Sequence, residues 1–203
     1  DSNNLCGALE FSEEISKAGT QPIIGTQINF KFKNEIGAIP IIAKNHKGYE
    51  TILKLSSDSY LNNLEDTVPC CDIQDLLNNP NGIIILSGSF NSLSNNLLKK
   101  NKLQYINELY ALLNNSFQND FYIEIQRHKN SNAKQLEQFN LVKSNELKLP
   151  IIATHEVFYI DKTMYEAHDA LLCIKNKTYV NDKSREKLSR DHNLKSDNEM
   201  FDL

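Results

Sequence analysis

Apolar runs of strand length alternate with helical stretches along most of this 203-residue chain, and this alternation strongly limits the folds open to it. Runs bounded by turn residues are typical of strands and cover residues 22–32, 38–44, 82–88, 121–126 and 150–154. The first two runs are separated by turn residues, so they form either a hairpin or two neighbouring strands. Apolar residues at helical spacing occur in residues 5–18, 49–61, 103–117 and 132–147, the last with Asn132 as its cap. Strands that alternate with helices form parallel βα units, so we expect an α/β protein built on a sheet or a barrel.

The length and composition favour one globular domain. A chain of 203 residues can bury one sizeable core, and 40% apolar and 24% charged residues are ordinary for a soluble protein. No run of about eighteen apolar residues is present, so we expect no membrane partner. The net charge of −4 argues against a domain that grips nucleic acid by itself, because such a domain carries a basic face. Because the chain begins at Asp1 and not at Met, we expect a piece of a longer protein.

The four cysteines indicate an intracellular protein. Cys6, Cys70, Cys71 and Cys173 have no paired spacing, and the adjacent Cys70 and Cys71 cannot form an ordinary disulfide with each other. We therefore expect reduced thiols and a cytoplasmic location.

The sequence has no glycine-rich nucleotide loop, P-loop or nucleophile elbow, so the histidines are the main candidates for catalytic or metal-binding residues. His46 lies in a turn and His192 in a polar tail, so we interpret both as solvated surface residues. His168 falls in a helical pattern, where a histidine on the polar face needs no special role.

Two histidines and an acid directly follow predicted strands. His128 ends the segment FYIEIQRH, and His155 and Glu156 follow the strand PIIAT. These side chains can converge where the strands of one sheet end. Metal centres generally need three or four ligands, so the residues leave two interpretations open: a metal site, or unrelated histidines at strand ends.

Seven segments, in this order along the chain, resemble one known family. They are DSNNLCGALEF, AGTQPIIGTQINF, IIAKNHKGYETILKLSS, NGIIILSGS, FYIEIQRH, LKLPIIATHEVFY and YEAHDALLCIKNKTYVND. Together they resemble the amino-terminal polymerase-and-histidinol-phosphatase (PHP) domain of bacterial DNA polymerase III alpha subunits. The resemblance implies a distorted barrel of seven βα units that lacks its first strand in this chain. Residues 1–175 would form the PHP domain, and the charged, poorly periodic residues 176–203 a connector towards the polymerase palm.

The resemblance also implies a metal cluster at the strand ends. In active members of the family, imidazoles and carboxylates there hold up to three metals, which hydrolyse phosphate esters. Where the family has Asp-His, this sequence has Asp1 and Ser2. Gln27 stands at the position of a family acid, and an amide has neither the charge nor the metal affinity of a carboxylate.

The remaining ligand positions are partly retained. His128 matches a family histidine, whereas the family's Asp-x-His has become Glu156 and Phe158. Glutamate can still ligate a metal and phenylalanine cannot. His155 stands where the family usually has Asn, so the resemblance does not make it a ligand. We expect the strand ends carrying Asp1, Gln27, His128 and Glu156 to face one cavity, as vestiges of a metal site.

These substitutions favour a non-catalytic scaffold domain, with no catalytic residue and no bound metal in this chain. The resemblance implies that the full-length protein is a DNA-directed DNA polymerase with Mg²⁺ in its palm. Its implied partners are the rest of the alpha chain, DNA and a proofreading exonuclease subunit. One alternative is a metal-dependent 3′–5′ exonuclease or phosphoesterase acting through Asp1, His128 and Glu156. Another, a free-standing phosphatase of the histidinol-phosphate type, is disfavoured because residues 165–182 resemble the polymerase's path towards its palm.

Overall fold

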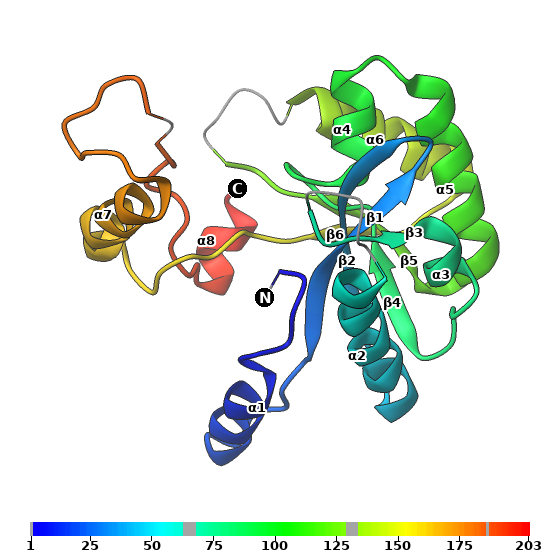
Figure 1. The fold of residues 1–203 in the computed structure, drawn as a ribbon, viewed down its shortest axis with the longest axis horizontal. Helices are drawn as coiled ribbons and strands as arrows, with labels where there is room; N and C mark the ends of the chain where they lie inside the picture. Colours follow the sequence, from blue (N-terminus) through cyan, green and yellow to red (C-terminus); the bar gives the residue numbers. More distant parts are fainter. Residues whose placement is uncertain (1, 63–67, 129–133, 186) are drawn as a thin grey trace.

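The chain folds around one mixed β-sheet, against which the helices of the middle of the chain pack, whereas the helices of residues 8–17 and 165–176 lie away from it (Figure 1). The computed structural model describes residues 2–62, 68–128, 134–185 and 187–203. The strands are β1 (Gly25–Phe32), β2 (Glu35–Ala43), β3 (Cys71–Asp72), β4 (Ile83–Leu86), β5 (Phe121–Ile125) and β6 (Ile151–Ala153). All five predicted strands are present, and the expected α/β class is confirmed.

The helices follow the predicted pattern closely. They are α1 (Ala8–Lys17), α2 (His46–Leu61), α3 (Ile73–Leu77), α4 (Leu93–Lys99), α5 (Leu103–Phe117), α6 (Lys134–Leu147), α7 (Tyr165–Asn176) and α8 (Asp197–Phe201). Two 3₁₀ turns, η1 (Gln118–Asp120) and η3 (Lys162–Met164), precede β5 and α7. The prediction for α5 is confirmed at both ends, whereas α2 begins earlier because Asn45 caps it by accepting from the Gly48 amide. The predicted Asn132 cap lies outside the described residues.

The strand order corrects the barrel prediction. The sheet runs β3-β1-β2-β4-β5-β6, and among the described residues its outer strands β3 and β6 do not pair with each other, so the sheet is open. β1 and β2 form an antiparallel hairpin whose turn residues Lys33 and Asn34 have positive φ angles of 49° and 64°. β2 also pairs antiparallel with β4, whereas β4, β5 and β6 are parallel. The hairpin replaces a parallel βα connection, and the two edge strands are only two and three residues long.

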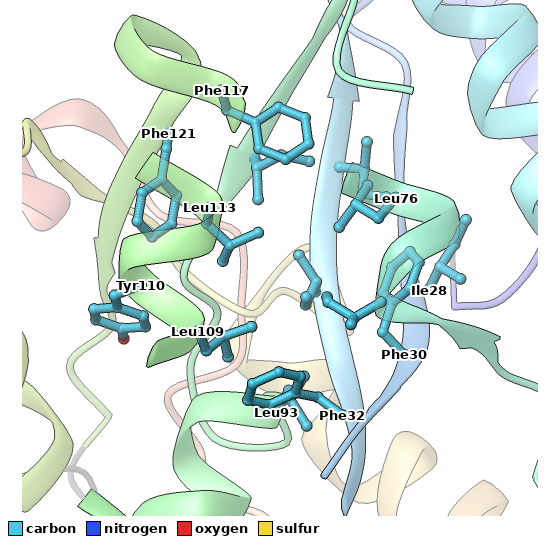
Figure 2. Packing of buried hydrophobic residues seen from close by; sticks show 14 of the residues in the cluster. Ile28, Phe30, Phe32, Leu76, Leu93, Leu109, Tyr110, Leu113, Phe117 and Phe121 are labelled. Atoms are coloured by element: carbon cyan, nitrogen blue, oxygen red, sulfur yellow. The ribbon is translucent and has the colours of Figure 1, made fainter. Parts of the chain in front are cut away.

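One face of β1 carries the hydrophobic core. Ile28, Phe30 and Phe32 are buried and alternate along the strand with the less buried Gln27 and Asn29. Figure 2 shows the side chains that lie opposite them, which come from α5 and β5 and include Leu109, Tyr110, Leu113 and Phe121. The polar residues of β1 therefore face the other side of the sheet.

A buried hydrogen-bond chain joins three elements behind the core. The Tyr110 hydroxyl of α5 donates to Asn140 Oδ1 of α6 at 2.7 Å, and Asn140 Nδ2 donates to the Glu124 carbonyl of β5 at 3.2 Å. Burial raises the pKa of Tyr110 to about 12, so the hydroxyl keeps its proton. These bonds fix β5 relative to the two helices that cover it.

The C-terminal residues return to the sheet. Backbone bonds join Phe158 N to the His192 carbonyl (2.9 Å) and Leu194 N to the Tyr159 carbonyl (2.9 Å). Arg127, just after β5, donates to the Leu203 carbonyl at 3.0 Å. Residues between 191 and 203 therefore contact the segments that follow β5 and β6. The boundary at residues 175 and 176 remains a prediction.

Two further sequence expectations concern the cysteines and the membrane. All four cysteines are among the described residues and are free of disulfides. Within the described ranges, no helix has the length and apolar character that crossing a bilayer requires.

A buried ionic contact at the start of β2 yields a pH-dependent prediction. The Glu35 carboxylate is buried and accepts from Lys100 Nζ and Lys102 Nζ, each at 2.7 Å. The hydrogen bond from Lys100, and then that from Lys102, hold the pKa of Glu35 below its usual value. A lowered folded-state pKa stabilises the fold above the unfolded-state pKa, and this stabilisation is lost as the pH falls through the folded-state value.

We therefore expect Glu35→Gln to lower the free energy of unfolding by about 1 kcal/mol at pH 7. The difference in free energy of unfolding between the variant and wild type should shrink as the pH falls below the unfolded-state pKa of Glu35 and towards its lowered folded-state pKa. Urea unfolding of both proteins at each pH would measure this difference. A difference that stays constant over this range would show that the charge of Glu35 contributes nothing.

Candidate metal centre

The polar face of the sheet brings several predicted site residues together. Ser2 forms a parallel bridge with Gln27, and the Asn3 amide donates to the Gln27 carbonyl at 2.7 Å. Gln27 lines a small pocket with Glu124 of β5 and Glu156, which follows β6. Ser2 and Gln27 therefore lie side by side, and Gln27 and Glu156 share one pocket. Asp1 lies outside the described residues.

Glu124 is the most buried acid of this pocket. It alternates with Phe121 and Ile123 along β5, which places its side chain on the face opposite the core. One carboxylate oxygen accepts from the Thr154 hydroxyl and from Gln126 Nε2, while the other has no hydrogen-bond partner among the described residues. Burial raises the pKa of Glu124. Burial also raises the pKa of Glu156, and the charge of Glu124 adds to that shift.

Beside this pocket, His128, Glu156 and His192 form a potential metal-binding group. One ligand atom from each residue lies within 4.8 Å of the other two. The His128 and His192 rings are stacked with their centroids 4.3 Å apart. Glu156 belongs both to this group and to the pocket lined by Gln27, so the two features are continuous.

His192 contradicts its sequence interpretation. The polar local sequence predicts a solvated residue, but only 4% of the surface of His192 is exposed. Its Nδ1 atom lies 3.1 Å from the Glu156 carbonyl oxygen, and its own carbonyl accepts from the Phe158 amide. Pairing between the segments after β6 and around residue 192 therefore carries this imidazole into the site, although the polar local sequence shows no sign of burial.

The other histidines lie in varied surroundings. His46 is exposed and lies 3.4 Å from Glu50 on α2, which confirms its surface position. His155 packs on His128 with ring centroids 4.5 Å apart, and its Nε2 contacts the Asp191 carbonyl. His168 is half-buried and stacks on Phe158 at 5.2 Å. His155 and His168 thus line the surroundings of the site without joining the group of three.

The electrostatics of the group favour neutral imidazoles. Burial, together with the neighbouring imidazoles of His192 and His155, lowers the pKa of His128 to about 4. Burial also lowers the pKa of His192. Neutral imidazole is the form that binds metals, and two imidazoles with one carboxylate are a ligand set that zinc accepts.

The residues present do not fit the full cluster of up to three metals that the resemblance implies. Ser2 and Gln27 carry no charge, and Phe158 has no donor atom. The Phe158 ring lies 5.1 Å from that of His192 and 44% of the residue is exposed. The donors His128, Glu156 and His192 suit one ion.

Comparison with known proteins identifies the family. A family model described as the PHP domain matches residues 1–128, which include β1 to β5 and end at His128. The chain belongs to the PHP domain family. Glu156 and His192, two members of the potential metal-binding group, lie beyond the segment that the PHP model matches.

Relatives match this PHP chain over its whole length. DNA polymerase III subunit alpha of Rickettsia felis is 32% identical over 204 residues, covering 100% of this chain and 17% of the relative. The proteins of the same name from Caulobacter vibrioides and Borreliella burgdorferi are each 31% identical, over 214 and 215 residues, with 18% and 19% of their lengths covered. The chain thus spans less than a fifth of the length of these relatives.

Sequence reasoning missed two residues of the site. Glu124 carries a usable signal, because an acid within the otherwise apolar strand FYIEI requires a partner or a function. His192 carries no such signal, since only the pairing of residues distant in sequence reveals its burial.

Proposed function

We propose that this chain is the PHP part of a replicative DNA polymerase III alpha subunit and serves there as a scaffold that does not itself hydrolyse phosphate esters. One observation carries the proposal: similarity to proteins of that name extends over 100% of the chain while covering 17–19% of theirs. The complete polypeptide would then be a DNA-directed DNA polymerase of the cytoplasm, with Mg²⁺ in its palm. Its partners would include DNA and a proofreading exonuclease subunit.

The scaffold role rests on the donors present at the family's metal positions. Hydrolysis by clustered metals needs anionic ligands that hold cations close together, so that one activates water and another neutralises the phosphate. Gln27 offers a neutral amide, Ser2 a neutral hydroxyl and Phe158 no donor. Several cations in this site would lack the charge that offsets their mutual repulsion.

A metal-dependent 3′–5′ exonuclease or phosphoesterase is the second candidate. The group formed by His128, Glu156 and His192 favours it, because a bound ion beside a pocket can activate water. A single ion lacks the second cation that a multi-metal mechanism uses, so we rank this function below the scaffold.

Primer extension by the complete polypeptide tests the proposal. We expect template-directed incorporation of deoxynucleotides in Mg²⁺, and we expect Phe30→Ala, which weakens the PHP core, to lower the temperature at which preheating abolishes extension. A complete polypeptide that extends no primer would overturn the polymerase assignment. Equal heat resistance of wild type and variant would overturn the scaffold role.

A further inference from the structure

We propose that His128, Glu156 and His192 bind one zinc ion, which holds the C-terminal segment around residue 192 against the ends of β5 and β6. The inference goes beyond the scaffold function, because a scaffold can brace a polymerase without a metal. It also assigns a role to His192, for which the local sequence carries no functional indication.

The first support is the convergence of donors from three separate parts of the chain. His128 follows β5, Glu156 follows β6, and His192 belongs to the C-terminal segment. Their ligand atoms lie within 4.8 Å of one another. Zinc at about 2.1 Å from each donor requires separations of about 3.4 Å in a tetrahedral site, so shifts on the order of 1 Å complete the coordination. Water can occupy the fourth position.

The second support is independent of that convergence and concerns His128. Both of its ring nitrogens are buried, and neither has a hydrogen-bond partner among the residues that the structure describes. An unsatisfied buried polar group costs about 1–3 kcal/mol. A bound cation would satisfy one of these nitrogens, which explains why this half-buried imidazole has no protein partner among those residues.

The third support is the orientation of His192. The Glu156 carbonyl oxygen can only accept a hydrogen bond, so the contact at 3.1 Å assigns the proton to His192 Nδ1. The lone pair then lies on Nε2, which leaves that nitrogen to bind a metal, while Nδ1 also lies 3.8 Å from the Glu156 carboxylate. A backbone carbonyl that fixes the tautomer of a histidine in this way is a common feature around metal-bound imidazoles.

The chemistry of the three donors indicates which ion binds and what its binding does to the fold. Two imidazoles and one carboxylate suit zinc better than Mg²⁺ or Ca²⁺, which prefer oxygen donors. A ligand that binds only the folded arrangement stabilises it in proportion to its affinity. An ion bound by all three parts of the chain therefore opposes detachment of the C-terminal segment.

Zinc binding to the complete polypeptide tests the inference. The protein is stripped with a chelator, dialysed against zinc and measured by elemental analysis, and its affinity is measured by competition with a chromophoric chelator. We expect His192→Asn to bind one zinc fewer per chain than wild type, or to bind that ion at least about 100-fold more weakly. His46→Asn, which removes an exposed histidine, is the matched control and should bind zinc as wild type does.

Amide hydrogen exchange provides a readout of the fastening itself. Zinc should slow exchange at Phe158 and Leu194, whose amides donate across the paired segments, in wild type but not in His192→Asn. Glu156→Gln keeps the backbone contacts of residue 156 and should also lose the ion, which separates ligand loss from misfolding.

Two results would overturn the inference: equal zinc content and affinity in wild type, His192→Asn and Glu156→Gln, or zinc binding that leaves exchange at both amides unchanged. Neither result would affect primer extension, so failure of the zinc site is distinguishable from failure of the proposed function.

Discussion

Replacing Phe30 by alanine is expected to lower the free energy of unfolding of the PHP domain by about 3–5 kcal/mol. The Phe30 side chain of β1 is fully buried, and Figure 2 shows it within the cluster that α3, α4 and α5 close. Truncation removes the apolar contacts of the ring and leaves a cavity that the surrounding sheet and helices fill only partly.

Urea unfolding of wild type and Phe30→Ala would measure this loss. Phe201→Ala is the matched control, because 92% of Phe201 is exposed in the described structure and its removal should change the free energy by less than about 0.5 kcal/mol. Equal losses in the two variants would contradict the placement of the core.

The second large effect is expected at Gly48, in the first turn of α2. A Cβ atom built there would lie 1.7 Å from the Gly82 carbonyl oxygen and 2.5 Å from its carbonyl carbon. That oxygen already accepts from the Lys44 amide at 2.8 Å, so it cannot move away without breaking the contact between the residue that follows β2 and the turn before β4. Relief of the clash requires a shift of backbone, not a change of rotamer.

We therefore expect Gly48→Ala to destabilise the domain by about 3 kcal/mol or more, at the upper end of the costs of overpacking. Gly19→Ala is the matched control. Gly19 has a φ of +77°, but no atom of the described residues lies within 4 Å of the place that the added methyl group would take. Only the backbone conformation therefore opposes this change, at about 1–2 kcal/mol. Thermal unfolding of both variants distinguishes the effects, and a Gly48→Ala protein as stable as Gly19→Ala would refute the close approach of α2 to Gly82.

The sequence predicted the elements of this fold better than their assembly. Strands such as β1 and helices such as α5 have periodic apolar residues, and these periods depend only on local geometry. The two-residue strand β3 and the five-residue helix α3 are too short to show a period. The open order of the sheet depends on pairing between distant segments, which no local pattern records.

In the candidate site, too, the sequence predicted what depends on local pattern and missed what depends on contacts between distant segments. Gln27 and Glu156 share a pocket, and His128 and Glu156 lie in one group, because strand ends and sheet faces follow from the alternation. The expectation of no bound metal remains a prediction, and it rests on family ligand positions that do not include His192. Its burial depends on backbone pairing between two irregular segments, and irregular pairing has no sequence period.

The scaffold role is tested most directly by hydrolysis of single-stranded DNA. The complete polypeptide and its His128→Ala variant would be incubated without deoxynucleotides in Mg²⁺, Mn²⁺ or Zn²⁺, and release of nucleotides from the 3′ end measured. We expect the wild type to release no more nucleotide than His128→Ala in any of the three metals, because Ser2, Gln27 and Phe158 leave too few donors for clustered metals. Metal-dependent release by the wild type that is abolished in His128→Ala would show that the PHP domain is a nuclease and not a scaffold.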